Sequence, residues 1–391
     1  MNFEQIRDLE DTYVANTYGR YPLALVKGEG SYAYDPDGNQ YIDFTSGIGV
    51  NSLGYSDPGW VEAITKQAAT IQHTSNLFYT EPVSLVAEEV VKRTGLRRMF
   101  FSNSGAEANE GAIKAARKYS ATKYTGKDRF EIITLMGSFH GRTMATITAT
   151  GQDSFHKDFQ PFLQGFKYVE SNNSDAIKEA VSDKTCAIML EAIQGEGGVN
   201  NLDAEFIETI REICEAQDIL LIVDEVQTGI GRTGKFMSYM HYDLNPDIVT
   251  VAKGLGGGLP IGGIIFGEKT YDALKAGDHG STFGGNPVVC AGANYVLSVL
   301  NEEFIANVAK KGAYMKEKIL AMDGVESVSG KGLMIGIKPT EVSPADAVKN
   351  AMATGLLLLT AKDKIRLLPP LSITFEEIDE GLAILEQAIK A

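Results

Sequence analysis

The feature that most constrains the fold of this chain is the alternation of short apolar runs with longer helical patterns from residue 60 onward. Runs such as FEIITLM, AIMLEAI, ILLIVDEV and DIVTVAKG have the composition of buried strands. Segments between them, such as AEFIETIREICEAQ, repeat apolar residues with helical spacing. Strands that alternate with helices in this way form a mainly parallel sheet with helices on its faces. The sequence therefore predicts a large α/β domain.

Two further parts flank this domain. The 391 residues of the chain are enough for two or three domains. Residues 23–50 contain short β-type runs joined by a DPDG turn, a pattern typical of an antiparallel meander. Near the C-terminus, two long helical patterns between 288 and 322 lead into short strands between 325 and 368. We therefore expect an N-terminal segment at 1–52, a large α/β domain at 53–284 and a C-terminal α+β part at 285–391.

Charge and cysteine content exclude several classes of partner. The chain has 36 Lys and Arg against 51 Asp and Glu, a net charge of −15, and no concentrated basic patch, so we expect neither nucleic acid nor a membrane as partner. The first residues lack the apolar core of an export signal. Cys186, Cys214 and Cys290 stand far apart, without metal-type spacing. These features favour a cytoplasmic protein with free thiols and no bound metal.

Two charged residues at the ends of apolar strands are the first candidates for chemistry. Asp224 follows the run ILLIV, and a carboxylate at the carboxyl end of a parallel strand faces the crevice where α/β proteins bind ligands. Lys253 ends the run DIVTVA, where a desolvated lysine has a lowered pKa and is nucleophilic. Each also has an ordinary explanation, because Asp224 could cap a turn and Lys253 could extend its amine to solvent.

Two loops add groups that bind anions and flat rings. In SNSGAEANE, Ser104 and Glu107 match a capping box, and the helix that begins there offers free N–H groups to a phosphate. In GSFHGRT, Phe139 could stack on a flat cofactor and Arg142 could bind a carboxylate, whereas no partner of His140 is apparent. Taken alone, each of these residues is more often a cap, a core residue or a surface charge.

The combination of motifs resembles a known family. SNSGAEANE, GSFHGRT, EAIQGEGG, VDEVQTGIGRTG, VAKGLGGGLPIGG, STFGGNP and IRLLPPL occur in the order and approximate spacing of the class III, fold-type I aminotransferases that use pyridoxal 5'-phosphate. The resemblance extends from about Tyr18 to Leu371, and the opening stretch is most similar to the acetylornithine aminotransferase branch. It implies a seven-stranded-type, mainly parallel sheet wrapped by helices. It also implies a small α+β domain that the N-terminal segment and the C-terminal part form together.

The resemblance also assigns site residues and an assembly. Lys253 and Asp224 are implied to be catalytic, Lys253 as the covalent anchor of the cofactor and Asp224 as partner of its ring nitrogen. The implied cofactor-binding residues are Ser104, Gly105, Ala106, Phe139, Asp224, Gln227, Lys253 and Thr282, of which Thr282 would come from the second subunit of a homodimer. The implied substrate-binding residues are Arg142, Glu196, Ser281 and Arg366, with Glu196 neutralising Arg366 while the amino donor is bound.

The activity implied by the resemblance is transfer of the terminal amino group of N2-acetylornithine to 2-oxoglutarate, which gives glutamate in arginine biosynthesis. Ornithine, succinylornithine or 4-aminobutyrate as donor stays an alternative, because these enzymes share the cofactor residues. An NAD-dependent oxidoreductase would also account for the sheet and the glycine-rich turns, but neither GIGRTG nor GLGGGL is followed by a clear helical pattern. A non-catalytic binding protein gives no reason for a lysine at the end of an apolar strand.

Overall fold

Seven strands form the largest sheet of the computed structural model, which describes residues 1–390. The strand order across the sheet is β4 (Arg98–Ser102), β12 (Gly262–Phe266), β11 (Ile248–Val251), β10 (Leu220–Asp224), β7 (Thr185–Leu190), β5 (Glu131–Leu135) and β6 (Phe166–Val169). β12 pairs antiparallel with both of its neighbours, and the other pairings are parallel. The predicted mainly parallel sheet is confirmed.

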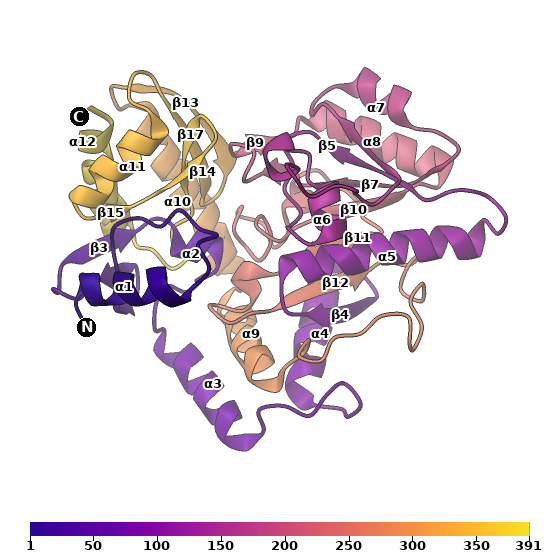
Figure 1. The fold of residues 1–391 in the computed structure, drawn as a ribbon, viewed down its shortest axis with the longest axis horizontal. Coiled ribbons are helices and arrows are strands. Elements are labelled where there is room, and N and C mark those ends of the chain that lie inside the picture. Colours follow the sequence, from indigo (N-terminus) through magenta and orange to yellow (C-terminus); the bar gives the residue numbers. More distant parts are fainter. Residues whose placement is uncertain (391) are drawn as a thin grey trace.

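Helices cover both faces of this sheet, which is why its strands read as continuous apolar runs (Figure 1). Alternate strand residues divide between two cores: Ile222 and Ile248 pack with α5 on one face, and Leu221 and Val249 belong to the core on the other. The helices around the sheet are α4 (Glu81–Thr94), α5 (Gly105–Lys123), α6 (Met144–Ala149), α7 (Ser174–Ala180) and α8 (Ala204–Gln217).

The two ends of the chain build the smaller α+β part together. β15 pairs with β3 in parallel and completes a four-stranded sheet, and Phe44 packs against Gly381 of α12. Figure 1 shows these N-terminal and C-terminal segments side by side, next to the large sheet. The strands are β1 (Lys27–Glu29), β2 (Tyr32–Tyr34), β3 (Gln40–Asp43) and β15 (Leu356–Leu357) in one sheet, and β13 (Val325–Lys331), β14 (Met334–Pro339), β17 (Lys364–Leu367) and β16 (Leu359–Ala361) in the other. The C-terminal helices are α10 (Glu302–Leu320), α11 (Pro344–Ala353) and α12 (Phe375–Lys390).

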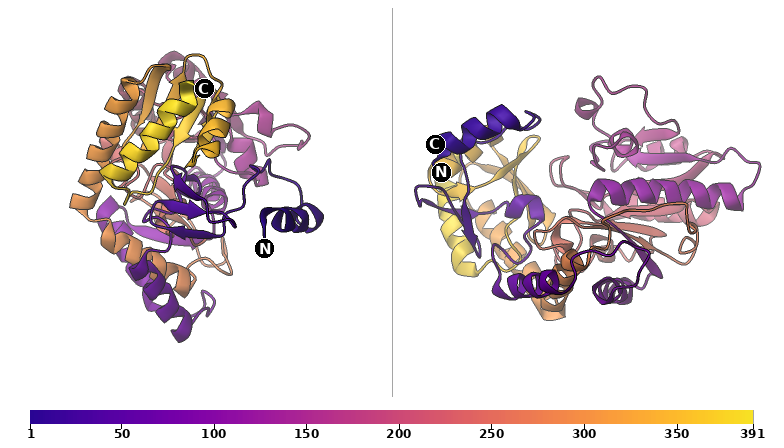
Figure 2. Two further views of the ribbon diagram at one scale, coloured as in Figure 1. Left: turned by 90° about the vertical axis from the view of Figure 1, so that its left-hand side faces the viewer. Right: turned by 60° about the horizontal axis from the view of Figure 1, so that its bottom comes forward.

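Shorter elements connect these parts. Helix α9 (Pro287–Val299) packs against α4 and against α3 (Pro58–Thr70). Helix α1 (Phe3–Tyr13) buries none of its residues and projects from the body (Figure 2). The remaining elements are α2 (Ser46–Gly49), the strand pair β8 (Ile193–Gln194) and β9 (Asn200–Asn201), and the 3-10 turns η1 (Asp153–Phe155), η2 (Ser238–His241) and η3 (Lys253–Leu255). Among residues 1–390, no helix has both the length and the hydropathy needed to cross a membrane. The domain limits at 53 and 285 stay a prediction.

Candidate active site

The carboxyl ends of the parallel strands border a cavity of about 620 Å³. Its walls come from the segments that follow β4, β5, β7, β10 and β11, and from the N-terminal part of the chain. Strand ends are where open α/β sheets bind their ligands, because the chain there turns away and exposes side chains and backbone N–H groups. Nine of the candidates from the sequence line this cavity: Ser104, Gly105, Ala106, Phe139, Arg142, Glu196, Asp224, Gln227 and Lys253. The buried Arg366 lies behind them and contacts Glu196 and Gln227.

Asp224 is held at the end of β10 by three donors. Its Oδ1 accepts from the backbone N–H of Val226 at 2.9 Å, and its Oδ2 accepts from Asn109 Nδ2 at 2.7 Å. His140 Nδ1 lies 2.8 Å from the same Oδ2, and since a carboxylate only accepts, this nitrogen carries the hydrogen. Thr250 in turn donates to Asn109, so the carboxylate is fixed by a buried network rather than by a flexible contact.

Lys253 begins η3, with one residue between it and the end of β11, and has a positive φ of 41° that only the surrounding structure can maintain. Its side chain lines the cavity. Burial lowers the pKa of Lys253 below its usual value, and the charge of Arg366 acts in the same direction. Glu196 and Asp224 oppose that shift in pKa without cancelling it. A neutral amine is the nucleophilic form of lysine, so the site favours the reactive state.

The N-terminus of α5 supplies an anion-binding end to the cavity. Ser104 is the N-cap, and its Oγ accepts from the backbone N–H of Glu107 at 3.2 Å. The Glu107 carboxylate accepts from the backbone N–H of Asn103 instead of that of Ser104, so only the first half of the predicted capping box forms. The N–H groups of Gly105 and Ala106 point out of the first turn and bind no acceptor among residues 1–390. These groups and the helix dipole suit a phosphate.

Two aromatic rings lie beside an unpaired arginine. Phe139 and Phe155 meet edge to face with ring centroids 5.3 Å apart. The Arg142 guanidinium carbon lies 5.3 Å from the Phe155 centroid and 6.0 Å from that of Phe139. Arg142 is exposed and forms no ion pair or hydrogen bond with any described residue. Its guanidinium is therefore free to bind a carboxylate that enters the cavity.

A second arginine is buried and already paired. Arg366 on β17 donates through Nη1 to Glu196 Oε1 at 2.6 Å and to Gln227 Oε1 at 3.2 Å. Only 3% of its side chain is exposed, and its Nε has no partner among the described residues. Burial by itself would raise the pKa of Glu196, but the charge and hydrogen bond of Arg366 outweigh it and hold that pKa below its usual value.

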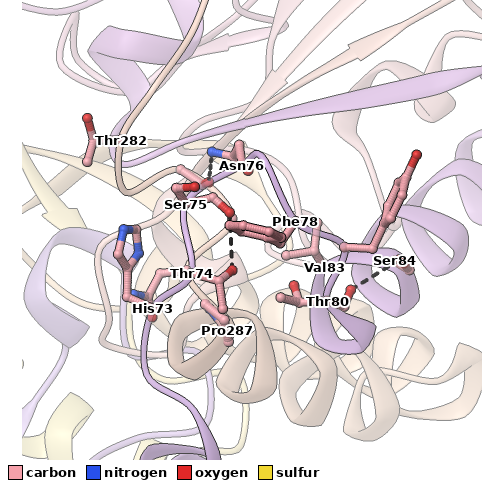
Figure 3. Close-up of a pocket in the computed structure, with 14 residues that line it drawn as sticks. His73, Thr74, Ser75, Asn76, Phe78, Thr80, Val83, Ser84, Thr282 and Pro287 are labelled. Atoms are coloured by element: carbon pink, nitrogen blue, oxygen red, sulfur yellow. Dashed lines mark hydrogen bonds between the residues drawn. The ribbon is translucent and has the colours of Figure 1, made fainter.

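Ser281 and Thr282 lie apart from the other candidates. Ser281 Oγ accepts from Asn103 Nδ2 at 3.1 Å but does not line the main cavity. Thr282 borders a separate cavity of about 160 Å³ between the start of α4 and the start of α9, where Figure 3 shows it with His73 and Pro287. A single chain therefore does not bring Thr282 to the residues around Lys253.

The sequence does not single out Asn109 and Glu191, and it reveals no partner for His140, although all three are neighbours of Asp224 in the site. Asn109 lies on helix α5 and His140 in the loop after β5, and only the fold shows that both reach Asp224. Glu191 did have a signal, because it follows the apolar run of β7 just as Asp224 follows the apolar run ILLIV.

Fold and site together define the class. The chain has the fold of fold-type I pyridoxal-phosphate aminotransferases: it superposes on the ornithine aminotransferase of Toxoplasma gondii with a TM-score of 0.95 at 30% identity, covering 100% of this chain and 95% of that one. It superposes on the N-acetylornithine aminotransferase of Stenotrophomonas maltophilia with a TM-score of 0.85 at 36% identity, covering 98% of both chains.

Sequence comparison then identifies the family. The model of the class-III aminotransferases matches residues 13–389, and the chain belongs to that family. It is 51% identical to the acetylornithine aminotransferase of Haemophilus ducreyi, over 100% of this chain and 99% of that protein. It is 46% identical to the acetylornithine aminotransferase of Methanocaldococcus jannaschii, over 99% of this chain and 98% of that protein. A second structure of the Toxoplasma enzyme is similar with a TM-score of 0.94 at 30% identity, over 100% of this chain and 94% of that one. It has pyridoxal phosphate at partial occupancy in the active site.

Proposed function

We propose that the protein transfers the terminal amino group of N2-acetylornithine to 2-oxoglutarate, giving N-acetylglutamate 5-semialdehyde and glutamate as a step of arginine biosynthesis. The observation that carries this proposal is full-length similarity, at up to 51% identity, to relatives named acetylornithine aminotransferase. The cytoplasm is the proposed location. Ornithine is the second candidate donor, because the ornithine aminotransferase of Toxoplasma gondii has almost the same fold.

The residues of the cavity suit pyridoxal 5'-phosphate. Free N–H groups at the start of α5 offer a phosphate site, Phe139 offers a ring face, and the Asp224 carboxylate offers an acceptor for a protonated ring nitrogen. Lys253 offers an amine with a lowered pKa for covalent attachment. When bound, this cofactor serves as an electron sink that stabilises negative charge on the substrate carbon beside the amino nitrogen.

Each side chain then has a task that its geometry allows. Lys253 moves a proton at the reacting carbon, because its amine switches readily between neutral and charged forms. Asp224, fixed by its three donors, keeps the ring nitrogen protonated. Gln227 lies beside Glu196 and Arg366 and orients polar groups on that side of the ring.

Two arginines bind the carboxylates. Arg142 is unpaired and binds the carboxylate at the far end of either substrate. Arg366 is neutralised by Glu196 while the donor is present, and separates from it to bind the second carboxylate of glutamate or 2-oxoglutarate. Ser281, next to Asn103, is proposed as a further substrate contact at the rim.

We also propose a homodimer whose sites are shared. Thr282 lies away from the main cavity in its own chain, and the segment around it exposes Leu77, Phe78, Tyr79 and Phe283. Neighbouring exposed apolar residues mark a protein interface. A two-fold axis through this surface would bring Thr282 to the partner's cofactor phosphate, twice in each dimer.

A donor panel tests the activity. With 2-oxoglutarate as acceptor, glutamate release is measured for N2-acetylornithine, N2-succinylornithine, ornithine and 4-aminobutyrate. We expect the highest kcat/KM with N2-acetylornithine, at least about tenfold above ornithine, a difference of about 1.4 kcal/mol in transition-state binding. A preference for ornithine or 4-aminobutyrate would overturn the proposed donor and leave the transaminase class intact. A protein that releases no glutamate with any of them would count against the activity itself.

A further inference from the structure

Glu191 and Asp224 occupy equivalent positions at the ends of neighbouring strands. β7 and β10 pair in parallel with Leu190 opposite Val223, so the next residue on each strand is a carboxylic acid that borders the same cavity. Both side chains are buried, with 5% of Glu191 and 3% of Asp224 exposed. Two acids this close, in an environment with little water, cannot both carry a charge without a large free-energy cost.

The hydrogen bonds distinguish the two acids. Asp224 accepts from three N–H groups, which suits a carboxylate because that form only accepts. Glu191 accepts from one, the backbone N–H of Phe139, which lies 3.1 Å from Oε2. Its other oxygen, Oε1, has no partner among residues 1–390. A neutral carboxylic acid can use Oε2 as acceptor and Oε1–H as donor at once.

The charges that face Glu191 favour its neutral form. Burial raises its pKa well above the usual value, and the negative charge of Asp224 on β10 raises it further. The positive charge of Lys253 lowers the pKa of Glu191. Because the pKa of Lys253 is itself lowered, a smaller fraction of Lys253 carries that charge. The negative charge of Glu196 also raises the pKa of Glu191, although Glu196 is paired with Arg366.

We propose that Glu191 is a positioning residue that acts as a neutral carboxylic acid: Oε2 fixes the backbone of Phe139, and Oε1–H donates to an acceptor on the bound cofactor or substrate. The proposal rests on the proposed function for the identity of what fills the cavity. The site then holds one ionised acid for the ring nitrogen and one neutral acid that orients the stacking ring without adding charge. Such a division between two neighbouring acids is a general device for tuning a site.

The first experiment detects whether the Glu191 carboxyl group is protonated, and it does not depend on catalytic activity. Infrared difference spectra of the cofactor-free protein, wild type minus Glu191→Gln at pH 7, should show the C=O stretch of a protonated carboxylic acid, with the shift expected in heavy water. If the difference contains only carboxylate bands, the proposal is overturned. The control is Glu225→Gln, because Glu225 is also buried but binds Ser238 and Thr228 outside the cavity.

The second experiment uses the enzyme loaded with cofactor. Glu191→Gln keeps an acceptor for Phe139 and an N–H donor for the cavity, so kcat/KM should stay within about tenfold of wild type. The pH midpoint of the cofactor absorption should also stay unchanged. A larger loss of kcat/KM with an unchanged Tm, or a shifted midpoint, would mean that Glu191 works as a carboxylate.

A third variant tests the contact with Phe139. Glu191→Leu lacks both oxygens, so affinity for pyridoxal phosphate should fall at least about tenfold, which is about 1.4 kcal/mol. Wild-type cofactor affinity in this variant would overturn the positioning role. These readouts do not depend on the donor: a donor panel that favours ornithine would refute the proposed substrate and leave all three results for Glu191 unchanged.

Discussion

At the scale of single residues, the carboxylate of Asp224 is the charge on which the proposed chemistry depends most. Replacing it by Asn keeps the size but puts an NH₂ group opposite the donors Asn109 and His140, and removes the negative charge. We expect Asp224→Asn to lose at least about three powers of ten in kcat, or about 4 kcal/mol. Steady-state assays measure the loss, and retained cofactor absorption shows that the site is still filled.

The matched control for this variant is Asp247→Asn. Asp247 is an acid that accepts from the backbone N–H of Leu221 near the opposite end of β10, and it does not border the cavity. The Asp247→Asn variant should have a lower Tm than wild type and a nearly unchanged kcat. Near-normal turnover of Asp224→Asn would show that the ring nitrogen does not need this charge.

The lowered pKa of Lys253 gives a prediction about pH. Burial lowers that pKa, whereas hydrogen bonding and the charge of Glu88 raise the pKa of the exposed Lys92. Only a neutral amine reacts with formaldehyde and borohydride, so in the cofactor-free protein Lys253 should become methylated at lower pH than Lys92. Mass spectrometry of peptides after brief labelling at a series of pH values measures both profiles. A midpoint for Lys253 at or above that of Lys92 contradicts the prediction.

Single residues also show what a sequence can and cannot reveal about a site. Asp224 and Lys253 were predictable because each charge interrupts an apolar strand, a local signal. The partners of Asp224 were not, because Asn109 lies on a helix and His140 in a loop, and the contact between them is a property of the fold. The ion pair of Glu196 and Arg366 spans 170 residues of sequence, and only the family resemblance indicated it.

At the scale of elements, helix α5 and the loop after β10 are packed together at the phosphate end of the cavity. A Cβ added to Gly105 would lie 2.6 Å from Val226 Cγ1, too close for any real contact. Gly105→Ala should therefore displace either the helix start or the loop that carries Asp224, and weaken cofactor binding at least about tenfold. Titration of the cofactor-free protein with pyridoxal phosphate measures this.

Gly111→Ala is the control on the same helix. The added Cβ would meet the flexible end of Ile264 on β12 rather than the cavity, so it should affect Tm without weakening cofactor binding. Equal loss of affinity in both variants would show that any disturbance of α5 is sufficient.

Strand β17 carries the arginine that distinguishes the two half-reactions. In Arg366→Ala the second carboxylate of glutamate loses its partner, so we expect the glutamate half-reaction to fall at least about 100-fold, or about 3 kcal/mol, and much more than the acetylornithine half-reaction. Single-turnover absorbance of the cofactor follows each half separately. Lys364→Ala is the control, because Lys364 lies on the same strand but binds Asn200 and Ser329. An equal loss of rate in the two half-reactions would argue against the proposal that Arg366 exchanges Glu196 for the second carboxylate of glutamate.

The elements themselves were largely predictable. The large sheet followed from the alternation of apolar runs and helical patterns, and the N-terminal meander from its short runs and DPDG turn. The antiparallel direction of β12 was not predictable, because GGIIF is apolar like its parallel neighbours and the direction depends on the connections. The pairing of β15 with β3 joins residues more than 300 positions apart, which no local pattern encodes.

At the scale of the whole molecule, a single chain leaves its proposed cofactor site without Thr282 and leaves an apolar surface exposed around it. Leu77 is 88% and Phe78 70% exposed, next to the cavity that contains Thr282 (Figure 3). Such a surface is costly in water, and a second copy of the chain can cover it and complete the site in one step.

Complementation between two inactive variants tests this assembly. Lys253→Ala lacks the amine, and Thr282→Glu should repel the partner's phosphate through its added charge. In a mixed dimer, one of the two sites receives an intact Lys253 from one chain and an intact Thr282 from the other. Random exchange makes half of the dimers mixed, so about a quarter of wild-type activity should return. As control, Lys253→Ala mixed with Asp224→Asn should recover nothing, since both residues serve the cavity of their own chain. If subunit exchange is demonstrated and the first pair stays inactive, or if the active enzyme sediments as a monomer, the shared site is refuted.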